Sequence, residues 1–87
     1  MNKKEIENLI KWWKNTDTQG MDIVKHLISP IMDAFGDDEN AILAYLNDMG
    51  VEDLGLIFGC FEAIYGKFTT AEVYEALGKL EDKLNNE

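Results

Sequence analysis

The 87-residue sequence contains no arginine, and histidine, cysteine and proline occur once each. A lone His26 and a lone Cys60 cannot form the clustered ligand set of a transition-metal site, and one cysteine excludes an internal disulfide. Cys60 lies in the apolar run "LGLIFGCF", where a free thiol behaves as a small buried hydrophobe. No apolar run approaches the roughly 18 residues of a membrane helix, and the first residues lack the pattern of a signal peptide. We expect a cytoplasmic protein that does not enter membranes.

The sequence also lacks the residue groups on which catalysis depends. Nucleophilic catalysis needs a nucleophile, a base and an orienting group, and no such set stands out beside the single His26. No glycine-rich phosphate loop is present. A calcium loop fails in both registers, because Phe35 stands at position 3 when counting from Asp33 and Ile42 at position 6 when counting from Asp37. The sequence therefore predicts neither an enzyme nor a cofactor.

Negative charge is plentiful, with a formal net charge of −9. No basic residue lies between Lys25 and Lys67, whereas this interval holds eight acids: Asp33, Asp37, Asp38, Glu39, Asp48, Glu52, Asp53 and Glu62. Such a field repels the phosphates of nucleic acids and anionic lipids and attracts cations. We expect a basic protein partner and no direct binding to DNA or RNA.

Apolar residues recur at helical spacing along the whole chain, without strand-like alternation. The pattern predicts helices over residues 2–15, 18–35, 38–49, 52–65 and 69–84. Connections of two to five residues favour antiparallel neighbours. We predict a single all-α domain, residues 1–87, built as a four- or five-helix bundle of antiparallel helical hairpins.

Capping residues place several of these helix ends. Asn2 is expected to cap the first helix with Glu5 three residues on, and Asp37 or Asp38 to cap the third. Thr69 with Glu72 predicts a capping box for the last helix, flanked by Phe68 and Val73 as a hydrophobic staple; Gly36 and Gly50 are expected to end the second and third helices. Pro30 leaves two possibilities, a kink in the second helix or a new short helix capped by Ser29.

The fourth predicted helix is apolar on nearly all sides and is therefore expected to be central. Gly55, Gly59 and Ala63 recur every four residues and predict close packing, either inside the protein or against a partner. A stripe on the second helix is expected to face inward: Val24, Leu27, Ile28, Ile31 and Phe35. The predicted common core comprises Leu46, Ile57, Phe58, Phe61, Val73 and Leu77.

The acids gather at helix boundaries, where one carboxylate is enough for a cap. Three consecutive acids, residues 37–39, repel one another, and the pattern repeats at residues 48–53. A well-solvated surface would explain this, and so would a docking site. Trp12, at the edge of the first apolar stripe, either covers the core margin or anchors an interface. The candidate partner-binding residues are Asp33, Asp37, Asp38, Glu39, Asp48, Glu52, Asp53 and Trp12.

Residues 52–83, "EDLGLIFGCFEAIYGKFTTAEVYEALGKLEDK", resemble the C-terminal helical pair of small immunity proteins that accompany bacterial polymorphic toxins. The resemblance implies a stoichiometric inhibitor that covers the basic substrate-binding region of a cognate toxin, expected to be a nuclease. An alternative is a phage-encoded anti-defence inhibitor, of the anti-CRISPR or anti-restriction kind, that mimics nucleic acid. A third is a helical adaptor that self-associates through Gly55 and Gly59. The oligomeric state stays open.

Overall fold

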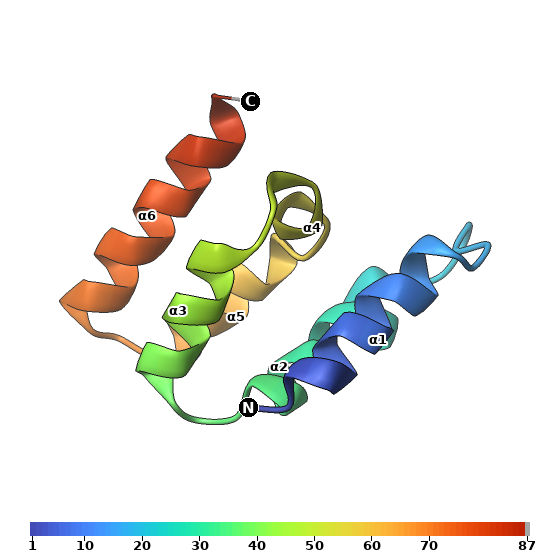
Figure 1. The fold of residues 1–87 in the computed structure, drawn as a ribbon, viewed down its shortest axis with the longest axis horizontal. Helices are drawn as coiled ribbons and strands as arrows, with labels where there is room; N and C mark the ends of the chain where they lie inside the picture. The colour runs from blue at the N-terminus through green and yellow to red at the C-terminus, as the bar shows by residue number, and fades with distance from the viewer. Residues whose placement is uncertain (87) are drawn as a thin grey trace.

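A computed structural model describes residues 1–86 and shows an all-α bundle (Figure 1). No strand occurs in this range, which confirms the predicted fold class. Six α-helices and one π-helical turn replace the four or five predicted helices within these residues: α1 Lys3–Lys14, η1 Val24–Ile28, α2 Ser29–Phe35, α3 Glu39–Asp48, α4 Val51–Leu56, α5 Gly59–Lys67 and α6 Ala71–Asn85.

The helices form two groups around one core (Figure 1). In the first group, α1 packs antiparallel against the continuous helical run of η1 and α2. In the second, α6 packs against α3, α4 and α5, and α3 runs in the same direction as α6 (Figure 1). Helix α5 joins the groups, because it contacts both η1 and α2 as well as α6.

The start of α1 follows the prediction closely. Asn2 Oδ1 accepts the backbone N–H of Glu5 at 3.1 Å, as expected of the N-cap residue. The backbone N–H of Asn2 also donates to the carbonyl of Ala34 at 2.9 Å, so the start of α1 is fixed to the end of α2. Ile6 and Ile10 are buried against the core.

The helical run that contains Pro30 begins later than predicted, after Asp22 rather than at residue 18. Ser29 provides no side-chain cap, and its backbone N–H donates to the carbonyl of Val24, five residues back. This π turn enters α2 without a break and sets Pro30 near its start. The π turn holds one residue more than an α-helical turn. Because each residue turns a helix by about 100°, side chains before this turn point in a different direction from the one that regular α-helical spacing predicts. Val24, predicted in the core, is 57% exposed.

Both ends of α3 depend on local backbone geometry. Gly36 ends α2 with a φ of 73°, and Asp38 Oδ1 caps α3 by accepting the N–H of Ala41 at 3.2 Å. The prediction that Gly50 ends this helix is wrong by one residue. Met49 already has extended φ and ψ, whereas Gly50, with a φ of −68°, is the N-cap position of α4.

The predicted fourth helix is divided at Ile57 and Phe58. The N–H groups of Phe58, Cys60 and Phe61 each donate to a carbonyl three residues back, which tightens the chain into a turn. Gly55 and Gly59 flank this turn and weaken a continuous helix. The division leaves Ile57 and Phe61 buried but turns Phe58 outward, with 46% of its surface exposed; its predicted place in the core is wrong.

The division also separates the predicted small-residue strip into two sites. A Cβ at Gly55 would lie 3.9 Å from Leu84 Cδ2, and one at Gly59 would lie 3.3 Å from Ile28 Cγ1. Gly55 on α4 and Gly59 on α5 thus each face a side chain of this same chain. Gly55, Gly59 and Ala63 are nevertheless exposed, so the chain covers the strip only in part.

Helix α6 starts one residue later than predicted. Thr70, not Thr69, is the N-cap residue, and its Oγ1 accepts the N–H of Val73 at 3.3 Å. Glu72 consequently sits in the first turn rather than closing a capping box, and Phe68 ends α5. The predicted core positions Val73 and Leu77 are confirmed, and Leu80 on the same face is buried as well.

Candidate functional site

The acidic residues gather at the two ends of α3. We name residues 36–39 the Asp37 junction and residues 48–53 the Asp53 junction (Figure 1). The ten residues of α3 separate them by about 15 Å at 1.5 Å per residue. Asp33 on α2 and Glu62 on α5 lie outside both junctions and are exposed.

The Asp37 junction is bonded to the connection between α5 and α6. Lys67 Nζ donates to the carbonyl of Gly36 at 2.9 Å and pairs with Asp37 at 2.6 Å. The hydrogen bond from Lys67, together with its charge, lowers the pKa of Asp37 below its usual 3.8. The Thr70 hydroxyl donates to the carboxylate of Glu39 at 2.5 Å. Two of the three consecutive acids therefore have internal partners, and Asp38 serves as the cap.

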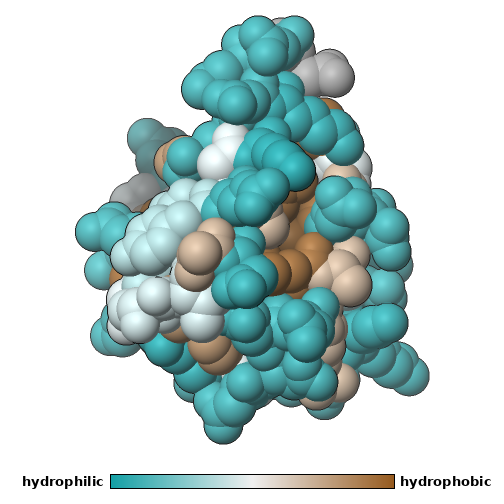
Figure 2. All heavy atoms as spheres, turned by 90° about the vertical axis from the view of Figure 1, so that its left-hand side faces the viewer, coloured by the Kyte–Doolittle hydropathy of each residue, from teal (hydrophilic) through white to brown (hydrophobic). Residues whose placement is uncertain are grey.

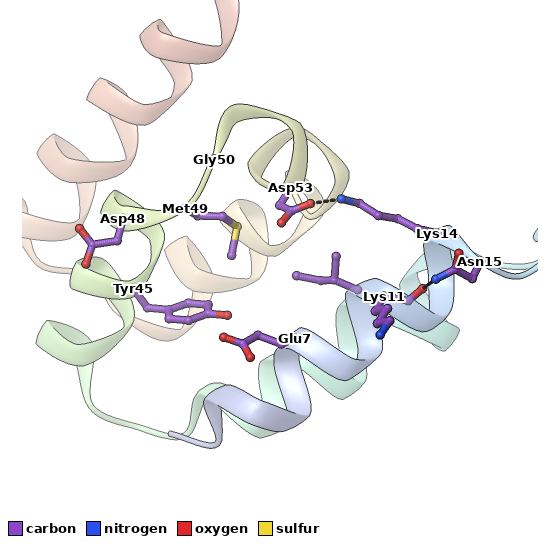
Figure 3. Close-up of a pocket in the computed structure, with 10 residues that line it drawn as sticks. Glu7, Lys11, Lys14, Asn15, Tyr45, Asp48, Met49, Gly50 and Asp53 are labelled. Atoms are coloured by element: carbon purple, nitrogen blue, oxygen red, sulfur yellow. Dashed lines mark hydrogen bonds and ion pairs between the residues drawn. The ribbon is translucent and has the colours of Figure 1, made fainter.

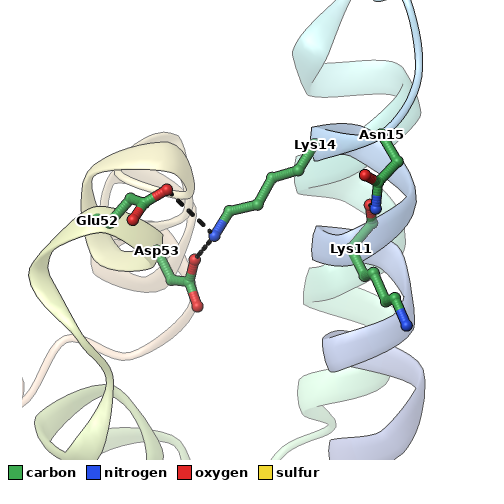
Figure 4. Close-up of polar contacts among 5 residues, drawn as sticks. All are labelled: Lys11, Lys14, Asn15, Glu52 and Asp53. Carbon is green, nitrogen blue, oxygen red and sulfur yellow. Dashed lines mark hydrogen bonds and ion pairs between the residues drawn. The ribbon is translucent and has the colours of Figure 1, made fainter.

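At the Asp53 junction, Lys14 reaches across from the end of α1 to α4 (Figure 4). Its Nζ forms ion pairs with Asp53 and, at 3.5 Å, with Glu52. The hydrogen bond to Asp53 raises the pKa of Lys14. Figure 4 also shows the Lys11 side chain directed away from both carboxylates. Lys14 therefore connects α1 to α4, two helices that are distant in sequence.

A groove of about 520 Å³ opens beneath the Lys14 bridge, between α1 on one side and α3 and α4 on the other (Figure 3). Apolar groups of Ile10 and Met49 lie along it, and the Glu7 carboxylate and the Tyr45 hydroxyl point toward each other from opposite walls (Figure 3). The lining residues are Glu7, Ile10, Lys11, Lys14, Asn15, Tyr45, Asp48, Met49, Gly50 and Asp53.

Tyr45 lies in the groove near the carboxylates of Glu7 and Asp53. Its pKa is raised, first by burial and then by the negative charges of Glu7 and Asp53. Glu7 lies on α1 and Asp53 on α4, so negative charges from both walls of the groove act on the Tyr45 hydroxyl. Glu7 has no ion pair within residues 1–86. The α1 wall of the groove therefore carries a carboxylate without an ion pair in the described residues.

Trp12 does not join this site. It is 43% exposed and meets Trp13 edge to face, with ring centroids 6.3 Å apart. It borders a separate shallow hollow on α1 together with Leu9 and Asn8. Two helical residues span about 200°, so Trp12 and Lys14 occupy nearly opposite faces of α1. The structure brings Asp48 and Asp53 to one groove but leaves Trp12 elsewhere.

A third hollow lies between α3 and α6, on the face that Figure 2 presents. Apolar surface runs along this face between hydrophilic edges (Figure 2). Glu75 and Lys79 on one edge, four residues apart on α6, pair with each other at 3.2 Å. The apolar lining comes from Leu43, Ala44, Ala76 and Leu80.

Glu7, Tyr45 and Met49 were not among the predicted partner-binding residues. Glu7 is one of several charged residues of α1 and has no distinguishing neighbours in sequence. Tyr45 and Met49 have the spacing of core positions in α3. Lys14 and Lys67 were likewise missed as partners of the acids, because they lie 39 and 30 residues from Asp53 and Asp37 in sequence. The concentration of acids at residues 48–53 was the one signal that pointed to this groove.

Residues 1–86 contain no candidate metal site. No cluster of three or more His, Cys, Asp or Glu side chains could hold a metal ion there. Cys60 is buried, and burial raises the pKa of its thiol to about 12, so the nucleophilic thiolate is not formed at neutral pH. None of the helices in this range has the length and apolar character of a membrane span.

The chain has no match among protein-family models, curated proteins or solved structures.

Proposed function

We propose that this protein is a bacterial cytoplasmic inhibitor of the immunity type, which binds a basic toxin domain, a nuclease in our proposal, and covers its substrate-binding surface. The observation that carries the proposal is the acidic surface around α3. Carboxylates at both ends of this helix are exposed. The segment that contains α3, residues 26–66, has no lysine or arginine. The inhibitor acts by occupancy and needs no catalytic group of its own.

Local ion pairs leave most of the negative field in place. Lys14 and Lys67 compensate carboxylates at the two junctions, whereas no ion pair within residues 1–86 involves Asp33, Asp38, Asp48 or Glu62. A field of this kind accelerates the approach of a cationic surface. Tight binding then requires a few desolvated contacts at the centre of the interface. The Asp53 junction supports such contacts, because its acids stand beside the apolar lining of the α1–α3–α4 groove.

The decisive experiment starts from the product of the adjacent upstream gene. We expect an equimolar amount of this protein to abolish the toxicity of that product and to form a 1:1 complex measured by light scattering. A charge-removal scan should then be uneven, with substitutions at the Asp53 junction costing about 2 kcal/mol or more. Glu62→Gln is a matched control, since it removes one exposed charge outside both junctions.

Nucleic-acid mimicry predicts a different scan. A mimic reproduces a line of phosphates, so all eight acids would contribute small and similar losses. The complex would also be displaced by DNA or RNA. Those two results together would replace the immunity proposal by the anti-defence alternative. Self-association through Gly55 and Gly59 is the third alternative: both glycines are exposed, although the side chains of Leu84 and Ile28 lie beside them.

A further inference from the structure

The α1–α3–α4 groove is a hollow of the surface in which an apolar lining lies beside carboxylates of α1, α3 and α4. Helix α1 packs on η1 and α2, and Lys14 forms its ion pairs to α4 within residues 1–86. Below that bridge the groove stays open along Glu7, Ile10, Tyr45 and Met49 (Figure 3). Its volume of about 520 Å³ lies in the range of clefts that bind small molecules.

The groove combines an apolar lining with negative walls. Ile10 and Met49 offer hydrocarbon and thioether surface to the stem of a long side chain. The Glu7 carboxylate and the Tyr45 hydroxyl point toward each other from opposite walls (Figure 3). Opposite charge and an aromatic face together are what a cationic side chain recognises.

Lys14 demonstrates this mode of binding within the molecule. Its stem crosses the upper end of the groove, and its ammonium is held between Asp53 and Glu52 (Figure 4). The lower end carries the Glu7 carboxylate beside the phenol of Tyr45, and Glu7 forms no ion pair within the described chain. Lys11 lines the groove but is directed away from the Asp53 junction (Figure 4). The lower end is therefore complementary to a cation from outside.

We propose that the lower end of the groove receives an arginine side chain of the basic partner, with the guanidinium between the Glu7 carboxylate and the Tyr45 ring and the stem on Ile10 and Met49. Arginine fits better than lysine, because a planar guanidinium bonds a carboxylate through two N–H groups and stacks on an aromatic ring. This assignment rests on the proposed function, to which it adds the chemistry of the central contact.

The experiment needs no partner and uses the full chain labelled with ¹⁵N. N-acetyl-arginine amide is titrated to about 50 mM, since a single side chain is expected to bind in the millimolar range. We expect saturable shifts of the backbone amides around Glu7, Tyr45 and Met49. N-acetyl-citrulline amide, which has the same stem and a neutral urea head, should bind at least about tenfold more weakly, a difference of 1.4 kcal/mol.

Two variants localise the binding. Glu7→Gln should weaken arginine binding at least about fivefold, whereas Glu62→Gln, a matched loss of one exposed charge, should leave it unchanged. Glu7 is exposed, and thermal melts verify that both variants fold. Equal binding of citrulline, indifference to Glu7→Gln, or no saturable shift would overturn the assignment. Because no toxin enters this titration, its result is independent of whether the neutralisation experiment succeeds.

Discussion

Replacing Phe61 by alanine tests the packing of the bundle at its most sensitive point. Phe61 is 1% exposed and belongs to the cluster that unites all the helices. Truncating a buried phenylalanine removes its transfer free energy and leaves a cavity, which together cost about 3–5 kcal/mol. A domain of this size has a free energy of unfolding of roughly 4–13 kcal/mol, so the variant approaches the limit of stability.

Phe58 supplies a matched control of the same residue type. Its ring lies 5.1 Å from that of Phe61, but 46% of its surface is exposed. Phe58→Ala gives up part of the transfer term and opens no closed cavity, so we expect a loss of about 1 kcal/mol. Taking an unfolding entropy of about 2.1 cal/mol/K per residue, the two variants should melt about 20 °C and about 5 °C below the parent.

Urea titration followed by circular dichroism measures both losses, and unchanged m-values show that the denatured states are comparable. The reasoning fails if Phe61→Ala costs less than about 1 kcal/mol. It also fails if Phe58→Ala costs as much as Phe61→Ala, because equal losses would indicate one unbroken central helix with both rings inside.

Three further predictions follow from single contacts. Thr70→Ala should cost about 1 kcal/mol through loss of the α6 cap, and Thr69→Ala should be nearly neutral in the same urea titration. The Cys60 thiol, with its pKa raised to about 12, should stay unreactive toward a disulfide reagent at pH 8 until the protein unfolds. Asp37 should titrate by NMR below its usual pKa of 3.8, and return to it in Lys67→Met. Because the pKa of Asp37 is lower in the folded protein, the ion pair with Lys67 stabilises the fold above pH 3.8. This stabilisation is lost as the pH falls through the lower pKa of the folded state.

The sequence predicts those parts of the fold that depend on neighbours in the chain. Asn2 caps α1 because its partner is three residues away, and Val73 and Leu77 face inward because one helix sets their spacing. The choice between Thr69 and Thr70 was missed, since both threonines offer the same hydroxyl. It is Thr70 that also bonds Glu39 from another helix, 31 residues away.

Errors arose where tertiary packing competes with periodicity. Phe58 fits an apolar helix, but the turn between two glycines rotates it outward. The candidate site shows the same limit. The acids at residues 48–53 were visible as a group, whereas Glu7 and Tyr45 join them only when α1 and α3 are placed side by side. No local pattern contains that information.

Pro30 has an influence that extends beyond its own position. In a regular α-helix its ring would collide with the carbonyl of His26, to which residue 30 would normally donate an N–H. In the wider turn of η1 the hydrogen bonds reach five residues back instead, as from Ser29 to Val24. The same turn decides that Val24 faces water while Ile28 faces the core. Pro30 thus determines the rotational register of the helix, that is, which of its side chains face the core. Any relative that loses this proline can return to the regular register and present a different set of side chains on that face, without changing a residue of that surface.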